Sequence, residues 1–131
     1  ALMDVALATT HLVSAGFSDK VPTLPAVVLG LLDQEKITTN LPAFVFWVEI
    51  AGIKKGDIEE ISIVSPDGSL LLKTAKLHKN GRALYLGYAG KKIVSLLKEG
   101  RYTGHYKLIR NEKGKKQVLI SKKKMVTILD K

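Results

Sequence analysis

The chain has no cysteine among its 131 residues. Disulfide bonds, thiolate nucleophiles and cysteine ligands to metals are therefore excluded together. Histidine is scarce as well, and His11, His78 and His105 are too far apart for a local metal-binding motif such as H-x-H. We interpret the three histidines as surface or turn residues, and we expect no metal and no cofactor.

Long hydrophobic runs are also missing. The apolar run from Val21 to Leu32 is too short to cross a bilayer and contains Pro22 and Pro25. We therefore expect no transmembrane segment. The chain begins at Ala1 without an initiator methionine, and no basic segment followed by an apolar core marks a signal peptide. This beginning fits a processed chain and equally a fragment of a longer protein.

Sequence motifs for catalysis are lacking too. The segment LVSAG around Ser14 has no first glycine for a nucleophile elbow, and GYAGKK at 87–92 has the wrong spacing for a phosphate-binding loop. The acids that stand closest together lie in or beside predicted turns, and we interpret them as ordinary solvated residues: Asp57, Glu59, Glu60 and Asp67. We predict no catalytic residues and no enzyme. A compact enzyme whose site assembles only in space ranks last among the alternatives.

Charge is distributed unevenly along the chain. Residues 1–72 hold 4 Lys/Arg against 9 Asp/Glu, whereas residues 73–131 hold 17 against 3. The formal net charge of +9 therefore belongs to the C-terminal half. A field of this sign favours anionic partners such as nucleic acid, anionic lipid or acidic cell-wall polymer, and charge alone does not choose among them.

What the sequence does contain is the alternation typical of β-strands. Residues 43–51, AFVFWVEIA, are apolar on both faces, which predicts a central strand with Trp47 buried. Pro66-Asp67-Gly68 predicts a tight turn, and Asn80-Gly81 predicts a hairpin. Further strands are predicted at 59–65, 69–77, 82–90 and 101–110, with one or two more in 116–129.

About six or seven short antiparallel strands at regular spacing predict a mainly β fold, an immunoglobulin-like β-sandwich. A small barrel is the alternative. Before Asn40, alanine- and leucine-rich segments are interrupted by glycine and proline. We expect residues 1–40 to form a short, partly helical or extended arm packed on a β-sandwich domain of residues 41–131.

The C-terminal lysines are the strongest candidates for binding. Three of them are predicted at a hairpin tip, and three run consecutively, so that strand alternation sends the middle one to the opposite face. A bulge, an edge strand or a break is expected there, and lysines on an edge also hinder aggregation. The candidate polyanion contacts are Lys113, Lys115, Lys116, Lys122, Lys123 and Lys124. A surface that binds nucleic acid is expected to carry exposed aromatic residues among its charges, whereas we assign Tyr102 and Tyr106 to the core.

With these segments placed, a series of short motifs resembles a known family. SAGF is followed by LPAFVFWVEIAGIKKGD, SPDGSLL, YLGYAGKK and LKEGRYTGHYKLIR. This order resembles the C-terminal Ig-like accessory region of M23-type (LytM-like) bacterial peptidoglycan metallopeptidases, over residues 14–128. The zinc ligands of that family, of the H-x(3)-D and H-x-H type, match no position of this chain. The resemblance therefore implies a non-catalytic domain.

Our leading hypothesis is a non-catalytic accessory or binding domain of a bacterial cell-envelope protein, periplasmic or extracellular. Such a domain positions a peptidoglycan peptidase or contacts cell-wall polymer. The alternative is a nucleic-acid-binding small β-barrel module that uses the C-terminal basic surface. The oligomeric state stays open.

Overall fold

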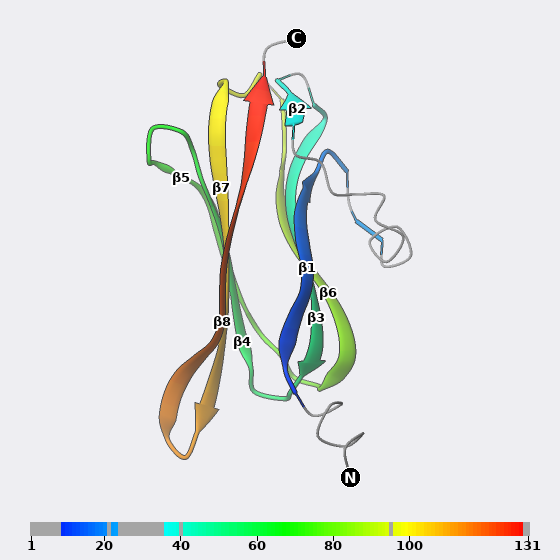
Figure 1. Cartoon of the computed structure of the whole chain (residues 1–131), viewed down its shortest axis with the longest axis vertical. Helices are drawn as coiled ribbons and strands as arrows, with labels where there is room; N and C mark the ends of the chain where they lie inside the picture. The colour runs from blue at the N-terminus through cyan, green and yellow to red at the C-terminus, as the bar shows by residue number, and fades with distance from the viewer. Residues whose placement is uncertain (1–8, 21, 24–35, 40, 95, 130–131) are drawn as a thin grey trace.

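The computed structural model describes residues 9–20, 22–23, 36–39, 41–94 and 96–129. Eight strands in these residues form two sheets that pack face to face (Figure 1). The three-stranded sheet has the order β1-β3-β6, formed by β1 (His11–Ser18), β3 (Ala43–Ile53) and β6 (Arg82–Lys92). The five-stranded sheet has the order β2-β8-β7-β4-β5, formed by β2 (Lys36–Thr38), β4 (Ile58–Val64), β5 (Leu70–Leu77), β7 (Gly100–Glu112) and β8 (Lys115–Leu129).

This strand order is that of an immunoglobulin-like sandwich. In chain order, β1, β3 and β6 take the A, B and E positions, while β8, β7, β4 and β5 take the G, F, C and C′ positions. The Tyr102 hydroxyl, near the start of β7, donates to the Lys98 carbonyl at 2.8 Å, which is the tyrosine corner of such domains. The predicted β-sandwich is confirmed. Its strands are antiparallel except where β2 runs parallel to β8.

The core lies between the two sheets and is rich in aromatic rings. Phe17 stacks on Phe44 and Phe46, with ring centroids 5.4 and 4.9 Å apart, and Tyr102 meets Phe44 edge-on at 5.3 Å. Strand alternation turns Tyr102 and Tyr106 inward, as predicted. Trp47 is buried as well, but its side chain lies on the opposite face of β3 from that of Phe46. It therefore lies outside this core.

The prediction of a hairpin at Asn80-Gly81 is wrong. β5 pairs with β4, and β6 pairs with β3 from Ile53↔Arg82 to Ala43↔Lys92, so the segment between β5 and β6 crosses from one sheet to the other. A two-residue type I′ turn needs positive φ at both central residues, and neither Asn80 nor Gly81 has it. The long ladder to β3 thus takes β6 into the other sheet.

Two strands come from the segment that we expected to be an arm. β1 pairs with β3, and β2 pairs with the end of β8, so parts of residues 1–40 are built into both sheets. The helical alternative for this segment, and most of the apolar run from Val21 to Leu32, lie outside the described residues. Within the described part of the chain, no helix has the length and apolar character to span a membrane.

The residues after 115 form one long strand rather than two. β7 and β8 make a hairpin whose tip extends beyond the sandwich (Figure 1), with positive φ at Lys113 (51°) and Gly114 (79°). A shift in register between Leu108 and Ile109 marks a bulge between these strands. The hairpin tip predicted at the lysines is therefore present.

Candidate functional site

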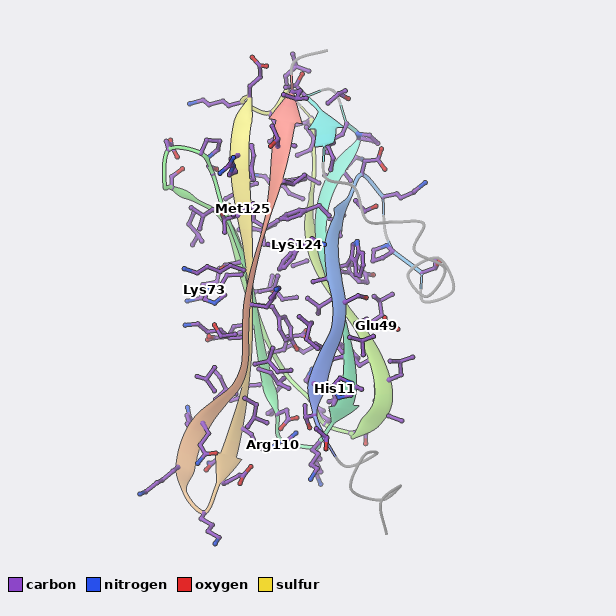
Figure 2. The ribbon with its side chains drawn as sticks, viewed as in Figure 1. His11, Glu49, Lys73, Arg110, Lys124 and Met125 are labelled. Atoms are coloured by element: carbon purple, nitrogen blue, oxygen red, sulfur yellow. The ribbon has the colours of Figure 1, made fainter. Side chains whose placement is uncertain are left out.

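The structure separates the six candidate lysines into three environments. Lys113, Lys115 and Lys116 are exposed at the tip of the β7–β8 hairpin. Lys122 and Lys124 share the inward-facing side of β8, where the Lys124 ammonium donates to the Ala15 carbonyl of β1 at 2.5 Å and so links the two sheets (Figure 2). Lys123 points to the opposite side, as alternation predicted. The six lysines are therefore not one surface.

Lys123 belongs to a polar row that crosses four strands. The row lies on the outer face, by which we mean the side of the five-stranded sheet turned away from the three-stranded sheet. Register places Lys73 of β5 beside Ser62 of β4, Ser62 beside His105 of β7, and His105 beside Lys123 of β8. Figure 2 shows Lys73 pointing away from the sandwich. The row therefore contains three basic residues, Lys73, His105 and Lys123.

A second row lies next to the first on the outer face. Glu60 of β4 pairs with Lys107 of β7, and Lys107 pairs with Ser121 of β8. Between the two rows the surface is hollowed by about 260 Å³. The lining of this hollow is Glu60, Ser62, Leu70, Lys73, His105 and Lys107. The lining combines positive charge, one hydroxyl group, one carboxylate and one leucine on a single open face.

His105 stands at the centre of the outer face. Its Nε2 atom lies 2.9 Å from the Ser121 hydroxyl oxygen. Partial burial, followed by the charges of Lys107 and Lys123, lowers the pKa of His105 below its ordinary value of 6.5, against the opposing effect of Glu60. The ring is therefore mainly neutral at pH 7, and it gains its charge only on acidification.

The interpretation of Asp57 as a solvated turn residue is wrong. Its carboxylate is fully buried and accepts from Arg110 Nε and Nη2, both at 2.8 Å, and from the Lys54 amide at 2.9 Å. Burial acts to raise the pKa of Asp57, but the Arg110 hydrogen bonds, the Lys54 amide and the Arg110 charge outweigh it, and the pKa is lowered. Arg110 also donates to Thr10, whose hydroxyl donates to the Gly52 carbonyl at 2.6 Å. This cluster joins β7 to the segment before β1.

Glu59 and His78 were likewise expected in solvent and are buried instead. Glu59 alternates with Ile61 and Ile63 on the inward face of β4, and its carboxylate accepts from the hydroxyls of Tyr106 at 3.0 Å and Tyr85 at 3.3 Å. His78 Nε2 lies 3.7 Å from Glu59, and its ring meets Tyr85 edge-on. Burial, then the Glu59 charge, raises the pKa of both tyrosines, so both hydroxyls stay protonated and donate.

The two buried acids are held by hydrogen bonds within the fold. Asp57 is held by three hydrogen bonds and Glu59 by two, in each case inside the sandwich. By contrast, Asp67 is exposed and accepts from the amide and the hydroxyl of Ser69, as its predicted turn requires. The outer face is therefore the better candidate for contact with a ligand.

The sequence contained part of the signal for this face. Alternation in RYTGHYKLIR predicted that His105 and Lys107 share a side opposite Tyr106, and the structure agrees. Lys73 joins them only through the pairing of β5 with β4 and of β4 with β7. Alternation within one strand does not reveal which strand is its neighbour.

Comparison with known proteins bears on the fold alone. No protein-family model matches the chain, and no curated protein matches it. Among solved structures, the C-terminal domain of wzt is similar, with a TM-score of 0.59 and 11% sequence identity, over 93% of this chain and 74% of that one. A likeness at this identity supports the β-sandwich architecture. The resemblance to M23-type accessory regions stays a prediction.

Proposed function

We propose that this chain is a non-catalytic binding domain of a cell-envelope protein and that its outer face contacts an acidic polysaccharide. The supporting observation is that Lys73, His105, Lys107 and Lys123 share one face of the five-stranded sheet, where the first three line a shallow hollow and Lys123 lies beside His105. Neighbouring strands lie about 4.8 Å apart, so the basic groups on β5, β7 and β8, with β4 between β5 and β7, span about 14 Å. An extended chain with repeated negative charges fits such a row better than a compact ligand does.

The polar groups between the lysines favour a sugar chain. Ser62 and Ser121 carry hydroxyls that both donate and accept, and the Glu60 carboxylate accepts from ligand hydroxyls. The lysines supply point-charge contacts to carboxylate or other acidic groups, and these contacts weaken as salt rises. Charge thus attracts the polymer, while the serines and Glu60 favour its hydroxyl-bearing units.

Nucleic acid is the competing partner for a positive face. Single-stranded nucleic acid is usually held by aromatic side chains on which bases stack. No Phe, Tyr or Trp lies at a described outer-face position of β4, β5, β7 or β8, and Glu60 opposes a phosphate-dense strand. These features favour the polysaccharide.

The proposal assigns no reaction to the chain. Asp57 and Glu59 are buried and accept three and two hydrogen bonds from neighbouring groups. Binding alone is a sufficient role for an accessory domain, which holds an attached hydrolase such as a peptidoglycan peptidase close to its polymer. That attachment is the part of the proposal that follows from the family resemblance.

Binding of the whole chain to polygalacturonate, neutral dextran and short single-stranded DNA, by calorimetry at low and at physiological ionic strength, tests the proposal. Lys73→Gln, Lys107→Gln and Lys123→Gln combined should weaken polygalacturonate binding about tenfold, which corresponds to about 1.4 kcal/mol. The matched control combines Lys113→Gln, Lys115→Gln and Lys116→Gln at the hairpin tip, with the same change in charge. It should lose less than about threefold.

Two results would overturn the proposal. Equal losses in the two triple variants would mean that net charge, rather than the outer face, attracts the polymer. Tight binding of DNA without binding of polygalacturonate would favour the nucleic-acid alternative.

A further inference from the structure

A second cavity, open to solvent, lies at the crossover between β5 and β6, and its lining is separate from the outer face. Its volume is about 220 Å³, and its lining is Lys76, Leu77, His78, Lys79, Asn80 and Arg82. The lining holds two lysines, one arginine and no carboxylate. Within the described residues, no ion pair joins Lys76, Lys79 or Arg82 to an acid. Positive charge is therefore concentrated on one short segment without a neutralising partner in the wall.

The backbone of this segment is fixed by contacts to the turn before β4. The His78 amide donates to the Asp57 carbonyl at 2.8 Å, and the His78 carbonyl accepts from the Gly56 amide at 2.8 Å. Gly81 lies so close to the Ile53 carbonyl that an added Cβ would stand 3.2 Å from it. Both ends of the crossover are thus held before any ligand arrives, which lowers the entropic cost of binding.

Lys76 is oriented by a neutral group rather than by an acid. Its ammonium lies 3.4 Å from the Tyr85 hydroxyl and 5.4 Å from the centre of the Tyr85 ring. The Tyr85 hydroxyl in turn donates to Glu59 in the interior. A cation–π contact and a phenol position the ammonium while leaving its full positive charge available to a ligand.

We propose that this cavity binds a phosphate group. The volume is below the range of pockets for drug-sized ligands, so a compact group fits it best. Arg82 can bind two phosphate oxygens at once, Lys76 and Lys79 add point charges, and the Asn80 amide adds a neutral donor. The phosphate has two sources, the free inorganic ion and the phosphodiester of an envelope polymer, and both present the same oxygens.

The site is independent of the outer face. In the register of β4 and β5, Lys76 lies opposite Glu59, an inward-facing position of β4. Lys73 lies opposite Ser62, which faces outward. A ligand in the crossover cavity therefore contacts different side chains from a polymer on the outer face. Failure of one proposal leaves the other unaffected.

Amide-shift titrations of the full chain test the phosphate site. One arm uses inorganic phosphate, one uses a glycerol phosphate oligomer, and chloride at matched ionic strength is the control. Saturable shifts at residues 76–82 are expected in at least one phosphate arm. Saturation by inorganic phosphate alone assigns the site to the free ion, whereas tighter saturation by the oligomer assigns it to a polymer.

Substitutions make the test specific. The side chains of Lys79 and Arg82 are exposed, so the variant that combines Lys79→Gln with Arg82→Gln should keep the amide spectrum of a folded protein. Its phosphate binding should be at least tenfold weaker. Lys113→Gln combined with Lys115→Gln changes the charge equally at the hairpin tip and should change binding less than twofold. Linear shifts in both phosphate arms, or equal losses in the two double variants, would overturn the proposal.

Discussion

Gly104 of β7 lies against the ring of Phe46 of β3, across the interface of the two sheets. A Cβ built on Gly104 would stand 2.8 Å from three atoms of that ring. Antibody domains join strands B and F here by a disulfide, and the corner tyrosine precedes the second cysteine by two residues. Tyr102 precedes Gly104 by the same interval. In a chain without cysteine, an aromatic ring packed on a glycine occupies the place of the crosslink.

Substitution of Gly104 by alanine should therefore destabilise the domain. The added methyl group overlaps the Phe46 ring in a closely packed core, and we expect a loss of about 1–3 kcal/mol in the free energy of unfolding. Urea unfolding followed by the fluorescence of the single tryptophan, Trp47, measures this loss.

A second substitution checks the cause. Phe46→Leu alone removes ring atoms and should also destabilise, but in combination with Gly104→Ala it makes room for the methyl group. The double variant should be more stable than the sum of the two losses predicts. Strict additivity would show that Gly104 and Phe46 do not oppose one another as described.

Gly104 also illustrates what the sequence could and could not predict. The period-two pattern of RYTGHYKLIR correctly predicted which side chains face the core, because alternation is a local property of an extended backbone. Pairing between strands is not local. Asn80-Gly81 satisfied the local rule for a hairpin, yet β6 pairs with β3 and leaves β5 at the edge of the other sheet.

The buried acids were missed for a similar reason. Acids beside a turn are usually solvated, and nothing within a few residues of Asp57 indicates otherwise. Its partner Arg110 stands 53 positions later, and Tyr106 stands 47 positions after Glu59. Burial of a charge depends on such partners, and only the fold brings them together.

Asp57→Asn should destabilise the protein through its effect on Arg110. The amide keeps the shape of the carboxylate but loses the charge that pairs with the guanidinium, which is mostly buried. We expect about 3 kcal/mol less stability by urea unfolding at neutral pH, within the range found when a buried pair is broken. An Asn variant as stable as the parent would mean that Arg110 is adequately solvated without Asp57.

The same pair predicts a pH dependence of stability. The pKa of Asp57 in the folded protein lies below its ordinary value of 3.8, so the folded state binds fewer protons than the unfolded state there. Stability from this pair is complete above pH 3.8 and is lost as pH falls through the lower, folded pKa. As pH decreases across this range, the free energy of unfolding, measured with urea, should decrease more steeply for the parent than for Asp57→Asn.

Tyr106→Phe should destabilise the core more than Tyr85→Phe. Tyr106 is fully buried and its hydroxyl donates to Glu59 at 3.0 Å, whereas Tyr85 is half-buried and donates at 3.3 Å. Loss of a hydrogen bond to a buried carboxylate costs about 1–3 kcal/mol, and we expect the Tyr85 variant to lose less than half as much. Equal losses in urea unfolding would show that Glu59 depends on both hydroxyls alike.

Polymer binding at the outer face should strengthen on acidification. The low pKa of His105, caused by partial burial and then by Lys107 and Lys123, leaves the ring mainly neutral at pH 7. A bound polyanion stabilises the protonated ring, so affinity must rise as pH falls through this pKa. Glu60 and Lys73 are the other charged groups that line the hollow.

Dextran sulfate is the suitable probe, because its sulfate groups stay ionised throughout this range. Between about pH 7.5 and about pH 5, calorimetry should show an affinity increase of about three- to tenfold for the parent. His105→Gln removes the titrating ring, keeps a polar side chain beside Ser121 and should flatten the profile. If the variant keeps the same pH dependence, another group responds to pH, and His105 does not contact the polymer.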